Sequence, residues 1–341
     1  MRPSTPEDGP AIVTLMREAG LHPQTDPHYL RWKYWQEHPD WPGPRSFVLT
    51  EGHDLLAHGA LVPGRLRWGE TRARVIHMID WAARREAVGA GVQLMKQVGR
   101  QTQFLLGIGG TEHTRKIMPL MGYRLCGTVT AFVRPLSPIR LLRSPSSGPR
   151  WKLGPRFARS VLWSVSAPRG DSGAWRSDPI DPADVKQVAD VLPVPAPGVP
   201  VLERSPELLR HALACPIAPV ELYALKRAGR VGGYFVLSHT PSQARLADLW
   251  MDSSDAADWR ALVHLAVRQA RAQADAAEIA AWASDTRLSQ ALLECGFHAR
   301  FTVPIYLRAS AGVTAPEHTL RAQMLDSDAF YLYDSRNPLW A

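Results

Sequence analysis

Two glycines at the start of a helical pattern, Gly89 and Gly91, have the clearest chemical potential in the sequence. A strand pattern at residues 74–81 precedes them, and a period of 3.6 residues then runs to about residue 101. Glycines let the backbone approach a pyrophosphate closely, and the first N–H groups of a helix lack internal partners. The order therefore predicts a phosphate-binding turn, although the glycine pair alone also fits an ordinary helix start.

The chain has 341 residues, which suits two domains of about 100–200 residues each. Its three cysteines lie far apart, without the spacing of a zinc site or a disulfide framework, so we expect no metal. No apolar run reaches the roughly 18–20 residues that a membrane span needs. The start of the chain does not resemble a secretory signal, and we expect a cytoplasmic protein.

The formal charge of +8 is unevenly distributed. Between His113 and Gly170 the sequence has eleven Arg and Lys residues and no Asp or Glu. Such a cationic stretch attracts phosphates, nucleic acid or acidic lipid. Charge alone does not choose among these partners.

The sequence is weakly repeated, which predicts a duplicated fold. Three landmarks recur in the same order: Asp8 and Asp184 at an offset of 176, Asp26 and Ser205 at 179, and Gly122 and Gly296 at 174. Each half then shows two hairpin strands, a third strand, a helix, a short strand, a helix and a long closing strand. The expected strands are 46–50, 55–62, 74–81, 104–108 and 123–134, then 220–226, 231–238, 244–251, 278–282 and 297–307.

These patterns divide the chain into a domain at 1–134, a basic Pro/Ser-rich linker at 135–174, a second domain at 175–310 and a tail at 311–341. Within the linker, residues 156–165 fit an amphipathic basic helix. That helix either lies on a membrane or a partner, or packs across the domain boundary. The tail is expected to dock on one of the domains.

The order from strand 74–81 through the glycine pair to the closing strand resembles the core of the GNAT superfamily of CoA-dependent N-acetyltransferases. The resemblance covers residues 1–134 and, more faintly, 175–308. It implies an α/β fold of two tandem GNAT-like domains, each a mixed, mostly antiparallel sheet that splays between its fourth and fifth strands, with acetyl-CoA in the splay. Carried over by position, Trp81 and Ala82 would contact the pantetheine arm, and the pyrophosphate would face Val88, Gly89, Ala90, Gly91 and Val92.

Three departures from the family pattern limit this inference. Glu86 stands where the motif usually has Arg or Gln, so Arg84 or Arg85 would have to compensate its charge. Many members carry a tyrosine acid four residues before the Gly-Tyr, whereas this chain has Met118 and, in the second half, Leu292. The second half also replaces the glycine loop by residues 253–258, which include two carboxylates, and its CoA site is expected to be lost.

Acyl transfer to an amine or hydroxyl needs a base near the thioester. Asp80 is our first choice and His77 the second, and strand alternation would place these two on opposite faces. Glu112 and His113 at the next helix start are alternatives. Surface or capping roles would also explain these residues.

The leading interpretation is a soluble acyltransferase that moves an acetyl or other acyl group from acyl-CoA to a small-molecule or sugar acceptor. Trp32, Trp35 and Trp41 favour an envelope or exopolysaccharide sugar, since indoles stack on sugar rings. A Fem-type aminoacyl transferase, which is also a tandem GNAT fold and uses aminoacyl-tRNA, would suit the cationic stretch. A degenerate, non-catalytic GNAT scaffold at a membrane is the third hypothesis.

Overall fold

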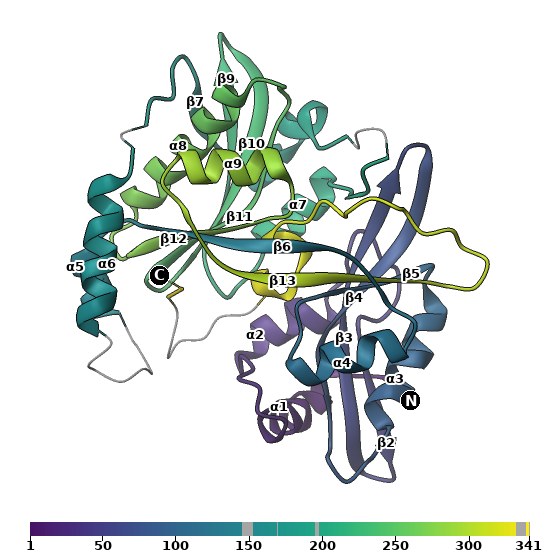
Figure 1. Cartoon of the computed structure of the whole chain (residues 1–341). Helices are drawn as coiled ribbons and strands as arrows, with labels where there is room; N and C mark the ends of the chain where they lie inside the picture. Colours follow the sequence, from purple (N-terminus) through teal and green to yellow (C-terminus); the bar gives the residue numbers. More distant parts are fainter. Residues whose placement is uncertain (145–152, 169, 195–197, 332–338, 341) are drawn as a thin grey trace.

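One twisted sheet runs through the whole molecule. The computed structural model describes residues 1–144, 153–168, 170–194, 198–331 and 339–340 (Figure 1). The strands form the order β1-β2-β3-β4-β5-β13-β6-β12-β11-β10-β9-β7, and β8 pairs with β3 beside this path. Helices lie on both faces, so the predicted mixed α/β class is confirmed.

The first half contains the elements that the repeat predicts. Its strands are β1 (Arg2–Pro3), β2 (Ser46–Glu51), β3 (Asp54–Trp68), β4 (Thr71–Ala83), β5 (Phe104–Ile108) and β6 (Arg124–Pro135). Its helices are α1 (Gly9–Glu18), α2 (Pro27–Leu30) continued by a π-helical turn (Arg31–Trp35), α3 (Ala90–Val98) with a 3-10 turn (Gly99–Gln101), and α4 (Glu112–Leu120). Asp26 begins α2 by accepting a hydrogen bond from the Tyr29 N–H, with Pro27 at the first helical position.

The second half repeats this order. Its elements are β7 (Arg176–Ile180), a 3-10 helix (Pro182–Val191), β8 (Val201–Leu202), α7 (Pro206–Leu213), β9 (Val220–Arg227), β10 (Arg230–Thr240), β11 (Gln243–Met251), α8 (Ala256–Ala272), β12 (Glu278–Ala283), α9 (Thr286–Glu294) and β13 (His298–Ala309). Two helices, α5 (Pro138–Arg143) and α6 (Leu153–Ser166), lie between the halves in sequence, and the expected linker helix is thus part of α6.

The two long closing strands are exchanged between the halves. β6 of the first half pairs with β12, β13 of the second half pairs with β5, and β6 and β13 pair with each other. The expectation that each half closes with its own strand is therefore wrong. The repeat itself explains the error. Both long strands are antiparallel to their partners, and the sequence shows that each of them pairs but does not show which half supplies its neighbours.

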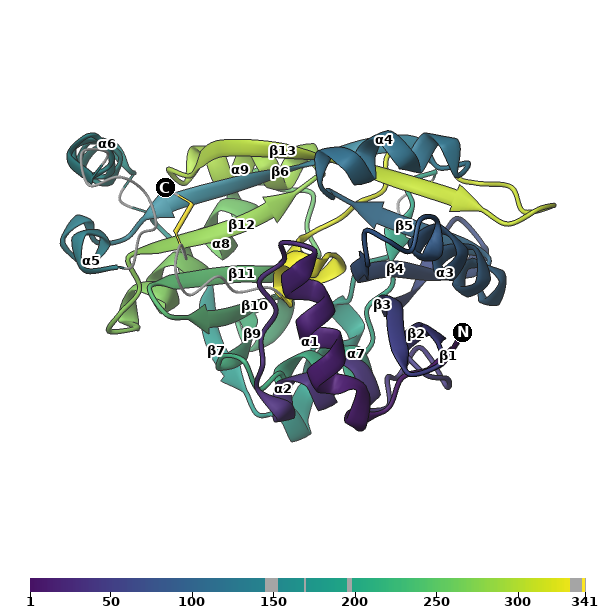
Figure 2. The same cartoon turned by 90° about the horizontal axis from the view of Figure 1, so that it is seen from below.

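Three large apolar cores and a small fourth one, which lies beside α5 and α6, hold the sheet and helices together. One core is shared by both halves on one face, where α1 and α2 meet α7 and the tail; Ile12, Val188, Leu209 and Phe330 belong to it. The other face is covered by α3 and α4 in the first half and by α8 and α9 in the second. Figure 2 shows the tail turns between the two arms of the sheet, beside α1.

The tail docks as expected, but it contacts both halves. Two 3-10 turns, Met324–Asp326 and Asp328–Phe330, are buried in the shared core. The Tyr29 hydroxyl donates to the carbonyl oxygen of Tyr331, which ties α2 to the end of the described tail. None of the described helices is long and apolar enough to cross a membrane.

Candidate functional site

The sheet opens between β4 and β5. These parallel strands pair at three positions, Val75 with Phe104, Ile76 with Leu105 and His77 with Leu106, and β4 then continues to Ala83 without β5 beside it. At the point of separation, the backbone N–H of Ile108 donates to His77 Nε2 at 3.4 Å. The Ile108 N–H lies beyond the last pair between β4 and β5, and the imidazole of His77 serves as its hydrogen-bond acceptor. The splay expected between the fourth and fifth strands is present.

A cavity of about 340 Å³ lies in this opening. Its wall is mostly apolar and comes from α1, β4, α3 and α4, including Met16, Leu21, Met78, Ile79, Met95 and Met118. The polar side chains of the lining are His22, His77, Asp80, Thr111, Thr114, Tyr123 and Asp328. A cavity that is largely apolar, with few polar groups converging on it, is the usual form of a small-molecule site.

His77 and Asp80 both line the cavity, so their expected separation onto opposite faces is wrong. The register between β3 and β4 shifts between His58 and Ala60, and Asp80 has a φ of +49°. A bulge of this kind re-aims one side chain and ends the alternation. Positive φ in a non-glycine residue is uncommon, and here it lies at the opening of the sheet.

Asp80 is held in a buried ion pair. Its Oδ2 lies 2.6 Å from Lys33 Nζ and accepts a hydrogen bond of 2.7 Å from the Tyr34 hydroxyl. Burial alone would raise the pKa of this carboxyl, but the Lys33 ammonium and the Tyr34 hydroxyl outweigh it and hold the pKa below its ordinary value. Asp80 is therefore a poor proton acceptor at neutral pH, since its charge is already paired.

His77 is neutral at physiological pH, because burial lowers its pKa to about 4. The Ile108 N–H donates to its Nε2, which leaves the proton of the neutral ring on Nδ1. This arrangement suits a group that fixes the apex of the splay more than a group that exchanges protons.

Asp328 of the tail is the second carboxyl in the cavity, and the sequence patterns did not indicate it. Burial, together with repulsion from Asp80, raises its pKa to about 6, partly offset by Lys33. It lies in a short 3-10 turn that begins at Ser327, whose hydroxyl accepts from the Ala329 N–H. No motif marks this residue, because its role depends on where the tail docks.

Glu112 and His113 lie apart from the other candidates. The Glu112 side chain is 85% exposed and pairs with Lys116 one turn along α4 at 2.8 Å. Among the described residues, neither Glu112 nor His113 contributes to the lining of the cavity. The structure therefore does not bring Glu112 together with His77 and Asp80.

The start of α3 is open. Gly89 precedes the helix with a φ of +85°, no described side chain caps the first turn, and a Cβ at Gly89 would meet no described atom within 4 Å. Val88 beside it is 93% exposed. A helix start leaves the N–H groups of Gly91 and Val92 without intrahelical acceptors. Ala90, which begins the helix, is buried.

At Gly91, the neighbouring indole of Trp81 leaves no room for a side chain. A Cβ there would lie 2.9 Å from Trp81 Nε1, and that indole donates to the Gly91 carbonyl oxygen at 3.0 Å. The absent side chain thus makes room for Trp81, which lines the cavity, and a bulky residue at Gly91 would disturb this packing.

The remaining residues of the predicted turn differ in exposure. Arg85 and Glu86 are exposed in the loop, and Arg84 lies 3.8 Å from Asp54. Ala82 is buried and pairs with His58 on β3. Arg84 and Arg85 thus lie on the same loop as Glu86, and their positive charges are opposite in sign to the charge of Glu86.

The equivalent place in the second half is filled. β11 and β12 pair as far as Leu246 and Ala281, and beyond that point the Gln323 side chain donates to the Leu249 carbonyl and accepts from the Leu249 N–H. Ser284 bonds the Ala322 backbone from the other strand. The tail thus occupies the second splay and uses the backbone groups that a ligand would need.

The start of α8 is also closed. Asp255 accepts from the Ala257 N–H, and Asp258 accepts from Ser253, Trp175 and Arg227. Asp255 thus satisfies one N–H group of the helix start, and the two carboxylates at this place would repel an anion.

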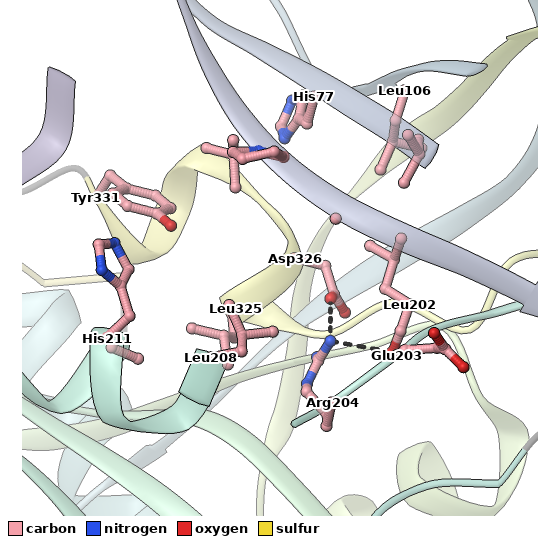
Figure 3. Close-up of a pocket in the computed structure, with 15 residues that line it drawn as sticks. His77, Leu106, Leu202, Glu203, Arg204, Leu208, His211, Leu325, Asp326 and Tyr331 are labelled. Atoms are coloured by element: carbon pink, nitrogen blue, oxygen red, sulfur yellow. Dashed lines mark hydrogen bonds and ion pairs between the residues drawn. The ribbon is translucent and has the colours of Figure 1, made fainter. Parts of the chain in front are cut away.

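A small void of about 30 Å³ lies between the halves, next to the large cavity (Figure 3). His77 lines both spaces. On its other side, Arg204 pairs with Asp326 at 2.7 Å and with Asp248 at 2.8 Å, so the tail is fixed by buried charges. Asp328 is two residues from this anchor, which holds its turn against the cavity.

Solved structures resemble this arrangement over most of its length. A GCN5-related N-acetyltransferase from Anabaena variabilis matches with a TM-score of 0.57 and 12% identity, over 90% of this chain and 71% of the other. The chain has the GNAT fold. A probable N-acyltransferase from Enterococcus faecalis, a conserved protein of unknown function (0.56, 10%, 90% and 72%), and a GCN5-related N-acetyltransferase from Kribbella flavida (0.55, 12%, 90% and 70%) give the same result. No family model and no curated protein matches the sequence.

The GNAT fold accounts for the splay, but the identities of 10–12% carry no site residue from one chain to another. The two tryptophans Trp32 and Trp41 are buried, and Trp35 donates to Ser4. None of the three lines the cavity, so they give no support to a stacked sugar. Among the described residues, no group of three metal-ligating side chains occurs.

Proposed function

We propose that this protein transfers an acyl group from acyl-CoA, acetyl-CoA first, to a primary amine bound in the cavity of the first half. One observation carries the proposal: the opening between β4 and β5 leads to a helix start that no described side chain caps. A diphosphate suits such a helix start because N–H groups and the helix dipole both face it.

The charges and positions of the residues at the opening between β4 and β5 suit acyl-CoA. The N–H groups at Gly91 and Val92, with Arg84 and Arg85, would hold the diphosphate, and Glu86 would weaken that contact. The backbone of β4 at Trp81 and Ala82 lies beyond the last pair with β5, where a pantetheine arm could run. Acyl-CoA supplies a thioester, whose carbonyl carbon is open to attack by an amine.

Asp328 is the group that we propose as the base. An ammonium must lose a proton before its nitrogen attacks, and a carboxylate with a pKa of about 6 is mostly ionised at neutral pH. The C–N bond then forms and the C–S bond breaks, the nitrogen gives up its second proton, and the thiolate takes up one proton, so that the net proton released is the one that Asp328 accepts. Tyr123 lines the same cavity, and burial raises the pKa of its phenol, so it remains a proton donor at neutral pH.

The lining also supports the choice of an amine acceptor. Lys33 compensates the charge of Asp80, which leaves Asp328 as the carboxylate that a cationic amine would meet. The methionines around it would contact an apolar part of the acceptor. A sugar hydroxyl carries no charge to match Asp328 and has less support.

The test uses the difference between aspartate and asparagine at one position. Both tolerate the positive φ of Gly89, but Gly89→Asp adds the charge that Asp255 contributes in the second half. We expect Gly89→Asp to weaken acetyl-CoA binding about tenfold or more, because like charges a few ångströms apart repel. Gly89→Asn is the matched control and should bind within a few-fold of the unmodified protein in calorimetry.

The same titration separates the alternatives. Equal binding of acetyl-CoA by Gly89→Asp and Gly89→Asn would contradict a diphosphate at α3. A rise in melting temperature with tRNA and not with acetyl-CoA would favour the Fem-type enzyme. No shift with either ligand would favour a non-catalytic scaffold.

A further inference from the structure

Helices α5 and α6 expose apolar side chains that the fold does not cover. Ile139 and Leu142 of α5 are 64% and 50% exposed, and Val161, Leu162 and Val165 of α6 are 36%, 65% and 80% exposed. Five of the twelve exposed large apolar residues of the described chain thus lie on these two helices, which contact each other. Contiguous exposed apolar surface usually marks an interaction site.

The apolar residues of α6 lie on one outward face. Ala158, Val161, Leu162 and Val165 follow the spacing i, i+3, i+4, i+7, and all four are exposed. The opposite face is held by Trp163, whose ring stacks on His298 of β13 with 3.9 Å between centroids. The anchored side thus fixes the direction of the apolar stripe, away from the protein. On this anchored side Trp163 also packs against a small core that contains Val133 and Ala277, so the helix meets both halves, as one alternative from the sequence expected. The outward stripe takes no part in that packing and stays exposed.

The surroundings of this stripe are cationic. Arg159 and Arg300 both lie over the Trp163 ring, at 5.1 and 5.7 Å from its centroid. Besides burial, the charges of Arg300 and Arg156 lower the pKa of Arg159, which shows that these cations repel one another. Arg143 is exposed at the end of α5. Residues 114–170 contain no acid, and only the charge of Glu278 partly offsets the repulsion on Arg159.

We propose that α5 and α6 dock on an anionic lipid surface. Exposed apolar side chains beside arginines are what an interfacial helix needs, with the apolar face entering the lipid and the cations meeting the headgroups. A second copy of the chain would bring the same arginines against this face and be repelled. Figures 1 and 2 show α5 and α6 together at one edge of the molecule, on the far side from α3, where a flat surface can reach them.

The experiment is sedimentation with vesicles. The protein should bind phosphatidylcholine vesicles that contain about a quarter phosphatidylglycerol, fail to bind pure phosphatidylcholine, and be released as salt rises. Leu162→Asn with Val165→Asn should lower the partition coefficient about tenfold or more, since two apolar side chains no longer enter the lipid. Leu120→Asn with Val194→Asn is the matched control, because Leu120 on α4 and Val194 in a loop are 87% and 64% exposed away from α5 and α6.

Three results would overturn the proposal. The first is no binding of the unmodified protein to the anionic vesicles, and the second is equal loss of binding in both double variants. The third is a dimer in analytical ultracentrifugation that only the α6 variant abolishes, which would make the occupant a second copy. Melting temperatures within about a degree of the unmodified protein show that the exposed substitutions leave the fold intact.

Discussion

The starts of α3 and α8 occupy equivalent positions in the two halves, each after the strand that precedes the splay. Gly89 leaves the start of α3 open, whereas Asp255 and Asp258 close the start of α8. The openings in the sheet show the same difference. The opening in the first half contains a cavity, and the opening in the second half is filled by Gln323 of the tail. The two copies of the fold thus differ: the first leaves a cavity and an uncapped helix start, and the second fills both places with its own residues.

The comparison also explains how the halves cooperate. The same tail fills the second splay with Gln323 and lines the first cavity with Asp328. Arg204, from the second half, anchors the tail between these two residues through Asp326. A closed second half therefore positions a carboxyl for the open one.

The largest effect is expected at Asp328. Asp328→Asn should lower kcat/KM about a hundredfold or more, because the amide cannot take a proton. The unmodified protein should gain activity as pH rises through about 6, and the variant should lose that step. Steady-state kinetics from pH 5 to about 8 would measure both. An unchanged rate and pH profile would exclude Asp328 as the base.

The stability of the same variant gives an independent check on its environment. A carboxyl whose pKa is raised by folding stabilises the fold below its unfolded pKa, and this contribution is lost as pH rises through about 6. Asp328→Asn should therefore raise the melting temperature by a few degrees at pH near 8 and by less at pH near 4. A variant that melts lower at both pH values would show that the carboxylate has a stabilising partner.

A smaller effect is expected from opening the second splay. Gln323→Ala should lower the free energy of unfolding by about 2 kcal/mol, since the N–H and C=O of Leu249 both lose their buried partner. Urea unfolding measures this change, and Gln101→Ala at an exposed position is the control. Acetyl-CoA should still bind at one site per chain, because Asp255 and Asp258 remain. A second site in calorimetry would show that the tail alone closes this half.

The smallest effect should come from Glu86. Glu86→Gln removes an exposed charge from the loop before α3, and acetyl-CoA should bind about threefold more tightly at low salt. Glu70→Gln, at an exposed position on the turn between β3 and β4, should leave the affinity unchanged. Equal effects of the two would mean that net charge matters and the position of Glu86 does not.

Local elements were the part of the fold that the sequence predicted well. The strand 104–108 and the helix 286–294 have the expected bounds, because apolar periodicity and cap residues act over a few neighbours. The splay was expected only through the family resemblance. The bulge at Asp80 was missed, since one residue with positive φ leaves no pattern in composition. Asp328 was missed because its position depends on contacts that are distant in sequence.

The strand exchange has a consequence for how the chain must fold. β5 meets its neighbour β13, and Leu106 its partner Leu307, only after nearly the whole polypeptide exists. Closing so long a loop is slow, and an unpaired β5 is an edge to which other chains can add. An isolated fragment 1–134 would keep that edge permanently, so we expect it to aggregate, while the complete chain unfolds in a single cooperative transition.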